Sequence, residues 1–352
     1  MAKETTEETS WLMVGHDKVA PIWYDLLWNI LEGILTIICY PITVALGIVS
    51  FLFYHLVIKK GKELFQFAPK EYAYEYIFIT GASSGIGRSI AVEFCKRFAK
   101  RTSQKQFTLT LSGRNSNALN EVKDECIKAI KESGHPEEDY QILIRICDVT
   151  DAEKLKEYLH EFDYDCVIAN AAVTTFLLME PGKKYTLLEQ TKLEMKCWET
   201  NMTGCTNTLF PALERMIEET DKGNTKRRHL ILTSSGTGYF PEIGLYPTVK
   251  SCLINLARNL RGRFDVSSKH KNIRVSVIVP GWVKTKMADA FPSKGMQVGM
   301  VNSEEAARLS CSGIEHDMEV IDLCGIYGIL MRVALRFPYT FSSPIIRLLG
   351  GK

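Results

Sequence analysis

The sequence predicts a doubly wound α/β domain, in which helices cover both faces of a parallel sheet, with a transmembrane helix before it. Nearly continuous apolar segments alternate with amphipathic stretches between residues 76 and 279, and the first segment runs through a glycine-rich turn into an amphipathic stretch. Strands buried on both faces have this apolar character, and helices between them make a sheet parallel. The third observation is a run of 25 residues, 34–58, without Lys, Arg, Asp or Glu.

The expected strands are the short apolar segments 76–80, 106–112, 140–147, 164–169, 228–234 and 273–279. The expected helices lie between them, at about 85–100, 116–133, 151–161, 188–219 and 246–266. A last strand followed by an apolar helix is expected within 318–336. Alternation of this kind is typical of βαβ units, which are wound into one sheet.

The glycine-rich turn lies in residues 76–87, YIFITGASSGIG. A strand, a glycine-rich turn and a helix in this order form a corner that binds dinucleotides. The first glycine permits the tight turn, the second lets the backbone approach a pyrophosphate, and the third lets the helix pack on the strand. The free amides and the positive dipole end of the helix then face the phosphates. The expected cofactor contacts are Gly81, Ser83, Ser84, Gly85, Ile86 and Gly87; the alternative is an ordinary strand-to-helix turn.

Composition excludes some classes of function. The net charge of +2 in 352 residues gives no electrostatic footprint for nucleic acid. Ten cysteines occur without a CxxC pair and mostly inside apolar runs, so we expect buried, reduced thiols and a cytosol-facing domain. The seven histidines are scattered without a metal-ligand spacing, and we expect no metal site.

The uncharged run predicts a single transmembrane helix at about residues 30–60. At about 1.5 Å per residue it is longer than the ~30 Å hydrocarbon core of a bilayer. A cleaved signal peptide is less favoured because the run is long and starts far into the chain, and a hairpin broken at Pro41 is the other alternative. Lys59, Lys60 and Lys62 follow the run directly, so the positive-inside rule places the larger C-terminal part in the cytosol.

The predicted organisation has five parts. A polar and interfacial N-terminus (1–29) precedes the anchor (30–60), a linker (61–74), the α/β domain (75–325) and an apolar C-terminal segment (326–352). The last segment is too short for a second span, so we expect a helix lying on the membrane surface. The alternative is a helix that packs on the domain.

Residues 246–250, YPTVK, indicate acid–base chemistry. Tyr246 and Lys250 are four positions apart, which on a helix puts both side chains on one face, about 5–6 Å apart at Cβ. A free tyrosine has a pKa of about 10, and a neighbouring ammonium favours the phenolate and lowers that pKa toward the working range. Tyr246 can then pass a proton to a carbonyl oxygen as a hydride reaches the carbon.

Two polar positions accompany this pair. Ser234 and Ser235 end the strand before it, at the sheet edge where ligands of such sheets bind, and a hydroxyl there can orient a substrate oxygen. The alternative for SSGTG is a simple turn at the end of a strand. Asn201 lies within an expected helix, where asparagine has poor propensity. Its buried amide is expected to hold a water through its carbonyl, with packing or capping as the alternative.

Four further features follow successive strands. The Asp148 carboxylate, followed by Val149, can accept a hydrogen bond from the amino group of an adenine. Asn170 and Ala171 lie where small residues let the backbone approach a cofactor. The PGWVKT turn, residues 280–285, can pair with a nicotinamide carboxamide. Arg114 stands where an NAD site offers Asp or Glu to the ribose, and an arginine suits a 2′-phosphate, so NADP(H) is the expected cofactor. All of these positions fall at the sheet edge that the glycine-rich turn defines.

Together TGASSGIG (80–87), DV (148–149), NAA (170–172), Asn201, Ser235, YPTVK (246–250) and PGWVKT (280–285) resemble the short-chain dehydrogenase/reductase family over about residues 74–325. The resemblance implies a Rossmann-type sheet of order 3-2-1-4-5-6-7 and a catalytic tetrad. It also implies that Lys250 binds the nicotinamide ribose and that Val283 and Thr285 hold the nicotinamide, with Pro280 as a further cofactor contact. The tetrad consists of Asn201, Ser235, Tyr246 and Lys250.

Within the family the chain is most similar to membrane-associated reductases of lipid-like carbonyls, such as 3-ketosphinganine reductases and 11-beta-hydroxysteroid dehydrogenases. This similarity implies an endoplasmic-reticulum membrane and, through the two long helices (188–219 and 246–266), a homodimer. The sequence departs from the family pattern in three places, one of which is the long connection at 181–192. Ala172 replaces a glycine, and only ten residues separate Ser235 from Tyr246, which leaves open whether Ser234 or Ser235 faces the substrate.

The predicted activity is reduction of a carbonyl, or oxidation of an alcohol, on a hydrophobic small molecule by a membrane-anchored NADP(H)-dependent enzyme. Residues 286–302 are expected to form a substrate lid with an apolar lining from Met287, Phe291, Met296 and Met300, and 181–192 to border the substrate mouth. The alternative is a structural or regulatory subunit of a membrane complex that keeps the fold and binds NADPH without turnover.

Overall fold

The computed structural model describes residues 30–31, 34, 72–101, 106–180, 182–239, 245–291 and 300–325. The chain divides into two compact units, Met1–Gln66 with Arg336–Ile345 and Phe67–Leu335 with Ile346–Lys352. The second unit holds the α/β domain. The greater part of the predicted anchor, the C-terminal segment from 326 and lid residues 292–299 lie outside the described residues.

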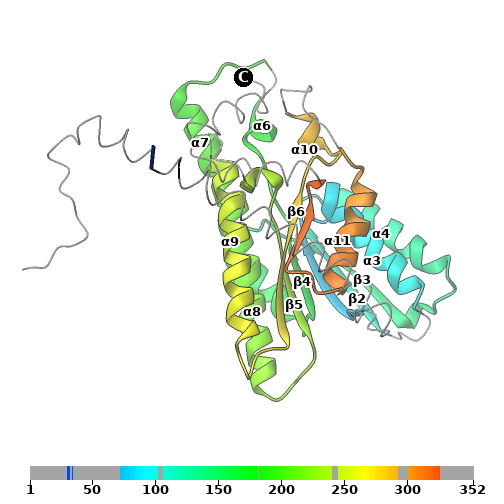
Figure 1. Ribbon diagram of the computed structural model, residues 1–352. Coiled ribbons are helices and arrows are strands. Elements are labelled where there is room, and N and C mark those ends of the chain that lie inside the picture. The colour runs from blue at the N-terminus through cyan, green and yellow to red at the C-terminus, as the bar shows by residue number, and fades with distance from the viewer. Residues whose placement is uncertain are drawn as a thin grey trace, which may run out of the picture. The chain divides into compact units, whose positions relative to one another are not determined.

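Seven parallel strands form one sheet in the order β3-β2-β1-β4-β5-β6-β7 (Figure 1). This order confirms the predicted topology. The strands are β1 (Tyr76–Thr80), β2 (Phe107–Gly113), β3 (Tyr140–Ile146), β4 (Cys166–Ala169), β5 (Arg228–Thr233), β6 (Ile273–Pro280) and β7 (Val320–Leu323). The chain reverses its direction of winding between β3 and β4, so β1 pairs with both β2 and β4. Ligands bind at this switch point in open α/β sheets.

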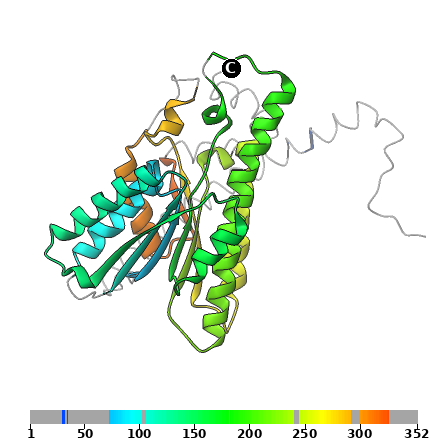
Figure 2. The ribbon, with the colours of Figure 1, turned by 180° about the vertical axis from the view of Figure 1, so that it is seen from behind.

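Helices cover both faces of the sheet (Figures 1 and 2). One face carries α3 (Gly85–Ala99), α4 (Ser116–Lys131) and α11 (Ser303–Glu315), and the other carries α5 (Ala152–His160), α8 (Gly204–Asp221) and α9 (Leu245–Asp265). Shorter elements are η2 (Glu137–Asp139), α6 (Thr175–Leu178), α7 (Leu187–Trp198), the π-helical turn η3 (Glu199–Thr203), η4 (Gly236–Tyr239) and α10 (Lys286–Asp289). The predicted helix 188–219 is therefore α7, η3 and α8 in succession.

Each strand contributes to two hydrophobic cores because its side chains alternate between the faces. In β1, Ile77 and Ile79 pack under α3 and α4, whereas Phe78 packs under α8 and α9. All three are completely buried. Burying a side chain of this size stabilises the folded state by about 1.5–3 kcal/mol. The apolar residues that predicted these strands therefore also stabilise them.

Helix α11 was not predicted from the sequence. Its buried face consists mainly of small residues, including Ala306, Ala307 and Cys311, which give little apolar periodicity. At its C-terminal end the fully buried Glu315 accepts hydrogen bonds from Arg97 and, at 2.7 Å, from Arg101. Burial raises the pKa of Glu315, and these two guanidinium groups oppose the rise. A buried charge of this kind must be paired, and the pairing joins α11 to the end of α3.

Among the residues that the structure describes, no helix combines the length and hydropathy that a bilayer crossing requires. Nine of the ten cysteines are described, and all nine are free thiols, eight of them buried. The expectation of unpaired cysteines is confirmed at these nine positions, and the expectation of burial at all of them except Cys252.

Candidate active site

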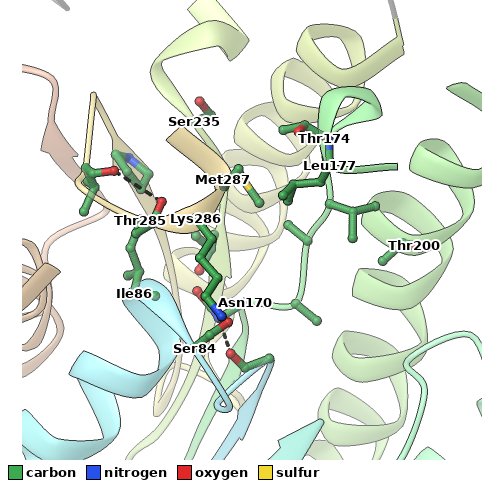
Figure 3. A pocket seen from close by; sticks show the side chains of 18 of the residues that line it. Ser84, Ile86, Asn170, Thr174, Leu177, Thr200, Ser235, Thr285, Lys286 and Met287 are labelled. Carbon is green, nitrogen blue, oxygen red and sulfur yellow. Dashed lines mark hydrogen bonds between the residues drawn. The ribbon is translucent and has the colours of Figure 1, made fainter. Parts of the chain in front are cut away.

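A cavity of about 550 Å³ opens at the carboxyl ends of the strands (Figure 3). It lies where the connections after β1, β4, β5 and β6 meet, so residues far apart in the sequence share one wall. It is lined by every predicted contact residue except Gly87 and Asn201, namely Gly81, Ser83, Ser84, Gly85, Ile86, Arg114, Asp148, Val149, Asn170, Ala171, Ser235, Tyr246, Lys250, Pro280, Val283 and Thr285. The structure thus brings together most of the site that the sequence predicted.

The glycine-rich turn has the geometry that a dinucleotide corner requires. Gly81 and Gly85 have φ of 67° and 56°, values that favour glycine. A Cβ at Gly87 would lie 2.4 Å from the Gly81 carbonyl oxygen, so helix α3 can approach the turn only with glycine there. Ser84, the residue before α3, makes no capping hydrogen bond with its side chain. Ser84, Gly85 and Ile86 line the cavity, so the uncapped start of α3 borders it, and this cradle fits a pyrophosphate.

Asn170 fixes the turn from the next strand. Its Nδ2 donates to the carbonyl oxygens of Thr80 at 3.1 Å and Gly81 at 3.3 Å, and its backbone amide donates to Thr80 Oγ1 at 3.1 Å. The end of β4 and the end of β1 are thereby held together. Asn170 lines the cavity, but its amide group is engaged with the protein and acts as a support for the turn.

The far end of the cavity pairs a cation with a carboxylate. Arg114 donates to Asp148 Oδ2 at 3.4 Å, while Asp148 Oδ1 accepts from the amide and the hydroxyl of Thr150 at 3.0 and 2.9 Å. Burial alone would raise the pKa of Asp148, but the bonds from Thr150 and the charge of Arg114 outweigh it and leave the pKa lowered. The Arg114 side chain is 68% exposed and remains accessible to a second anion.

Tyr246 and Lys250 lie on one face of α9, as their spacing predicted. The Lys250 ammonium is 5.5 Å from the centroid of the Tyr246 ring. Lys250 is buried and donates to the carbonyl oxygen of Thr233, at the end of β5, at 3.0 Å. The helix α9 and the strand β5 therefore fix the position of the ammonium together.

The pKa of Tyr246 differs from the expectation. Burial raises it to about 12, a hydrogen bond with Ser235 opposes the rise, and Cys197 adds to it. Burial also lowers the pKa of Lys250 to about 8. The expected lowering of the tyrosine pKa by the ammonium is not found, because Lys250 is directed at the Thr233 carbonyl and desolvation exceeds its influence.

The two serines have different surroundings. Ser234 is buried, and its hydroxyl donates to the carbonyl oxygen of Lys250 at 2.6 Å, which ties the end of β5 to α9. Ser235 lies in the cavity, accepts from the amide of Thr237 at 3.3 Å and bonds to Tyr246. Both serines line the cavity, but the Ser234 hydroxyl is engaged with Lys250, so Ser235 is the residue placed to meet a ligand beside Tyr246.

Asn201 is buried behind the cavity wall and does not line it. Its Oδ1 accepts from the amide of Val173 at 2.8 Å, and its Nδ2 donates to the carbonyl oxygen of Val173 at 2.8 Å and to Cys197 Sγ at 3.0 Å. The side-chain carbonyl that was expected to hold a water already accepts a hydrogen bond from Val173, and the water itself stays a prediction. The packing alternative describes these contacts, since Asn201 anchors the loop after β4, which lines the cavity.

The opposite end of the cavity is apolar. Leu177, Met287 and Phe291 line it (residues 177 and 287 are labelled in Figure 3), and the Tyr246 hydroxyl lies 3.9 Å from Met287 Sδ. The Phe291 ring packs edge-on against Phe176 and Trp282, with centroids 4.7 and 5.2 Å apart. Met287 and Phe291 of the expected lid are therefore part of the lining.

Sequence reasoning missed several lining residues. Leu177 belongs to the single turn α6, which Thr174 precedes, and Lys286 belongs to the single turn α10. Helices this short leave no periodicity to detect. The signal that was available is a threonine before each turn. Thr174 Oγ1 accepts from the Leu177 amide at 3.3 Å, and Thr285 Oγ1 accepts from the Ala288 amide at 3.4 Å. Met300 is described but does not line the cavity.

Comparison with known proteins agrees with this geometry. Residues 75–295 match the family model of the short chain dehydrogenases. The chain is 29% identical over 226 residues to an uncharacterized oxidoreductase of Myxococcus xanthus, covering 62% of this chain and 75% of that protein. It is 26% identical over 218 residues to an 11-beta-hydroxysteroid dehydrogenase A of Arachis hypogaea, covering 60% and 53%. Among solved structures it resembles levodione reductase, with a TM-score of 0.55, 20% identity and coverage of 72% and 98%.

The parallel seven-stranded sheet and the dinucleotide corner therefore belong to an oxidoreductase of the Rossmann type. The chain is a member of the short-chain dehydrogenase family, whose members act on alcohol and carbonyl groups with a nicotinamide cofactor.

Proposed function

We propose that this protein is an NADP(H)-dependent reductase or dehydrogenase of a hydrophobic, lipid-like carbonyl or alcohol. The proposal includes an anchor in the endoplasmic-reticulum membrane through residues 30–60, with the domain in the cytosol. The observation that carries the proposed reaction is the meeting of Ser235, Tyr246 and Lys250 in one cavity with the glycine-rich cradle. A hydrogen-bonded tyrosine beside a buried lysine is a proton donor in the place where a carbonyl substrate can meet the cofactor.

In the proposed reaction NADPH, when bound, supplies the hydride. Ser235 and the Tyr246 hydroxyl hydrogen-bond to the substrate oxygen, and Tyr246 gives it a proton as the carbon is reduced. The raised pKa of Tyr246 keeps the hydroxyl protonated at neutral pH, the form that reduction needs. Lys250, held at the Thr233 carbonyl, stabilises the negative charge left on the phenolate oxygen. Oxidation of the alcohol is the same sequence in reverse.

The preference for NADP(H) rests on Arg114. Its guanidinium lies at the cavity end opposite the apolar lining, is mostly exposed, and has only one long contact, to Asp148, among the residues described. A guanidinium binds a phosphate through two parallel hydrogen bonds, so it favours a 2′-phosphate over a ribose hydroxyl.

The hydrophobic substrate is inferred from the other end of the cavity. Leu177, Met287 and Phe291 surround the space next to Tyr246, and methionine adapts its shape to varied apolar ligands. Leu177, which lines the cavity, and its neighbour Phe176 are both more than a third exposed, so the apolar lining reaches the outer surface at Leu177. The similarity to a relative named 11-beta-hydroxysteroid dehydrogenase A favours the same substrate class.

The first test is NADPH oxidation in detergent with keto-sphingoid, 3-oxoacyl, steroid and retinoid carbonyls, wild type beside Tyr246→Phe. Loss of the hydroxyl should lower kcat by about 10²–10⁴-fold, the usual contribution of general acid catalysis. Binding of NADPH, measured by its fluorescence, should stay within about twofold, because the phenyl ring keeps the shape of the cavity wall. Equal turnover by both proteins would exclude the proposed mechanism. Tight NADPH binding without turnover of any compound would favour a structural subunit.

A further inference from the structure

We propose that Lys286 binds the phosphates of the dinucleotide, closing over them from the side opposite the first turn of α3. The inference rests on the proposed cofactor binding and adds a side chain from outside the glycine-rich turn that contacts the phosphates. Lys286 is the first residue of α10 and lines the same cavity as Ser84, Gly85 and Ile86.

The start of α10 lies against the start of α3. A Cβ built on Gly85 would be 3.4 Å from Cγ2 of Thr285, which is ordinary van der Waals contact. Thr285 immediately precedes Lys286 and caps α10. Figure 3 shows the Lys286 side chain extending from α10 into the cavity, toward the part where Ser84 is labelled. A phosphate held by the α3 amides would therefore lie within reach of this ammonium.

Each of the other cations of the cavity has a partner within the chain, although Arg114 keeps only one long contact and is assigned above to the 2′-phosphate. Arg88 donates to Glu125 at 3.1 Å, Arg114 to Asp148 at 3.4 Å, and Lys250 to the Thr233 carbonyl at 3.0 Å. Lys286 is exposed, and within the described part of the chain no carboxylate lies within 4.0 Å of its ammonium. An unpaired lysine that faces free helix amides forms a site for an anion, and a pyrophosphate supplies two negative charges there.

Consecutive residues of α10 divide the cavity into two halves. Thr285, just before the helix, lies beside Gly85 of the glycine-rich turn. Lys286 points into the phosphate half, and Met287 lies next to the Tyr246 hydroxyl. The half around Met287 and Leu177 is apolar, and an apolar substrate bound there offers no negative charge to a lysine. The lysine therefore serves the cofactor and not the lipid-like substrate.

The test compares Lys286→Gln with Lys284→Gln in the full chain. Lys284 is an exposed lysine two positions earlier and does not line the cavity, so it is the matched control. Because one charge-assisted contact contributes about 1.5–3 kcal/mol, NADPH should bind Lys286→Gln about 10–100-fold more weakly by nicotinamide fluorescence. The Lys284 variant should match wild type, and Lys286→Arg should restore most of the affinity. Competition by 2′-AMP, which lacks the pyrophosphate, should be unchanged in all variants.

The outcomes separate the two proposals. Wild type that fails to bind NADPH contradicts the proposed function as a whole. Wild type and Lys286→Gln that bind NADPH equally overturn the role of Lys286 and leave the cofactor assignment standing. Equal weakening by the Lys284 substitution would show a general effect of surface charge and would also overturn it.

Discussion

At the scale of single residues, the site sets two neighbouring groups to opposite pKa shifts. Burial raises the pKa of Tyr246 to about 12 and lowers that of Lys250 to about 8. Both shifts disfavour charge, so the resting pair is a neutral tyrosine beside a lysine that is easily deprotonated. In the proposed reaction the proton that leaves Tyr246 goes to the substrate oxygen, and the Lys250 ammonium stabilises the phenolate that remains. The phenolate, which burial disfavours in the resting site, therefore forms only during the proposed reaction.

Arg114 is predicted to determine which dinucleotide binds. Arg114→Ala should weaken NADPH binding about 10–100-fold, because a charge-assisted contact to the 2′-phosphate is lost, and should change NADH binding less than about threefold. The measurement is the Kd of each dinucleotide by fluorescence. Arg145→Ala is the control, since Arg145 pairs with Glu161 and does not line the cavity. Equal weakening for NADPH and NADH would contradict the assignment.

Some site residues can be placed from the sequence, whereas the contacts of others depend on the tertiary structure. Asp148, Asn170 and Ser235 each follow a strand in the sequence, and this position correctly predicted that they line one cavity. The sequence cannot choose between Ser234 and Ser235, because that depends on which hydroxyl meets the carbonyl of Lys250 on a helix 16 positions later. Nor does it reveal that Asn201 bonds to Val173, since that contact depends on how the loop after β4 folds back.

At the scale of elements, the strands were predicted from the sequence to within about two residues because their burial on both faces leaves a strong apolar signal. Helix α11 was missed, because it packs through alanines and a cysteine and is joined to α3 by the buried Glu315. Single turns such as α6 and α10 carry lining residues of the cavity but have too few residues for a period. The sequence therefore predicts the scaffold better than the substrate end of the site.

Strand β5 contains a buried histidine that makes the fold sensitive to acid. The ring nitrogens of His229 lie 2.7 Å from the Tyr74 hydroxyl and 2.7 Å from Ser276 Oγ. Burial and, less strongly, the charge of Arg227 lower the pKa of His229 to about 3. The ring therefore stays neutral in the folded chain, whereas in the unfolded chain it takes up a proton below about pH 6.5.

This difference predicts a loss of stability as the pH falls from about 6.5 toward 3, because the unfolded state then binds more protons. Between pH 8 and pH 5 the contribution of His229 to the free energy of unfolding should fall by about 2 kcal/mol. Urea unfolding of wild type and His229→Gln at both pH values measures it. The variant should be less stable at pH 8 but lose about 2 kcal/mol less on acidification. Parallel losses in the two proteins would show that His229 does not titrate as predicted.

At the scale of the whole molecule, two features of the chain agree with the proposed lipid-like substrate. They are the apolar end of the cavity and the uncharged run 34–58. An apolar lining that reaches the surface at Leu177 suits a substrate that is dissolved in a bilayer. The run 34–58 is long enough to keep the domain beside such a bilayer. Neither feature requires the other physically, so each is tested separately.

The full chain is predicted to stay in the membrane fraction after washing with alkaline carbonate, because a span of about 25 uncharged residues inserts irreversibly. Deleting residues 1–60 should leave the compact unit from Phe67 able to bind NADPH and reduce small water-soluble carbonyls. Its activity on lipid carbonyls in vesicles should fall at least about tenfold, since the domain no longer meets the bilayer surface at high local concentration. Immunoblots of the washed fractions and the two assays measure this. Release of the full chain by carbonate would contradict the anchor, and a deletion variant that remains on membranes would assign the attachment to residues 326–352.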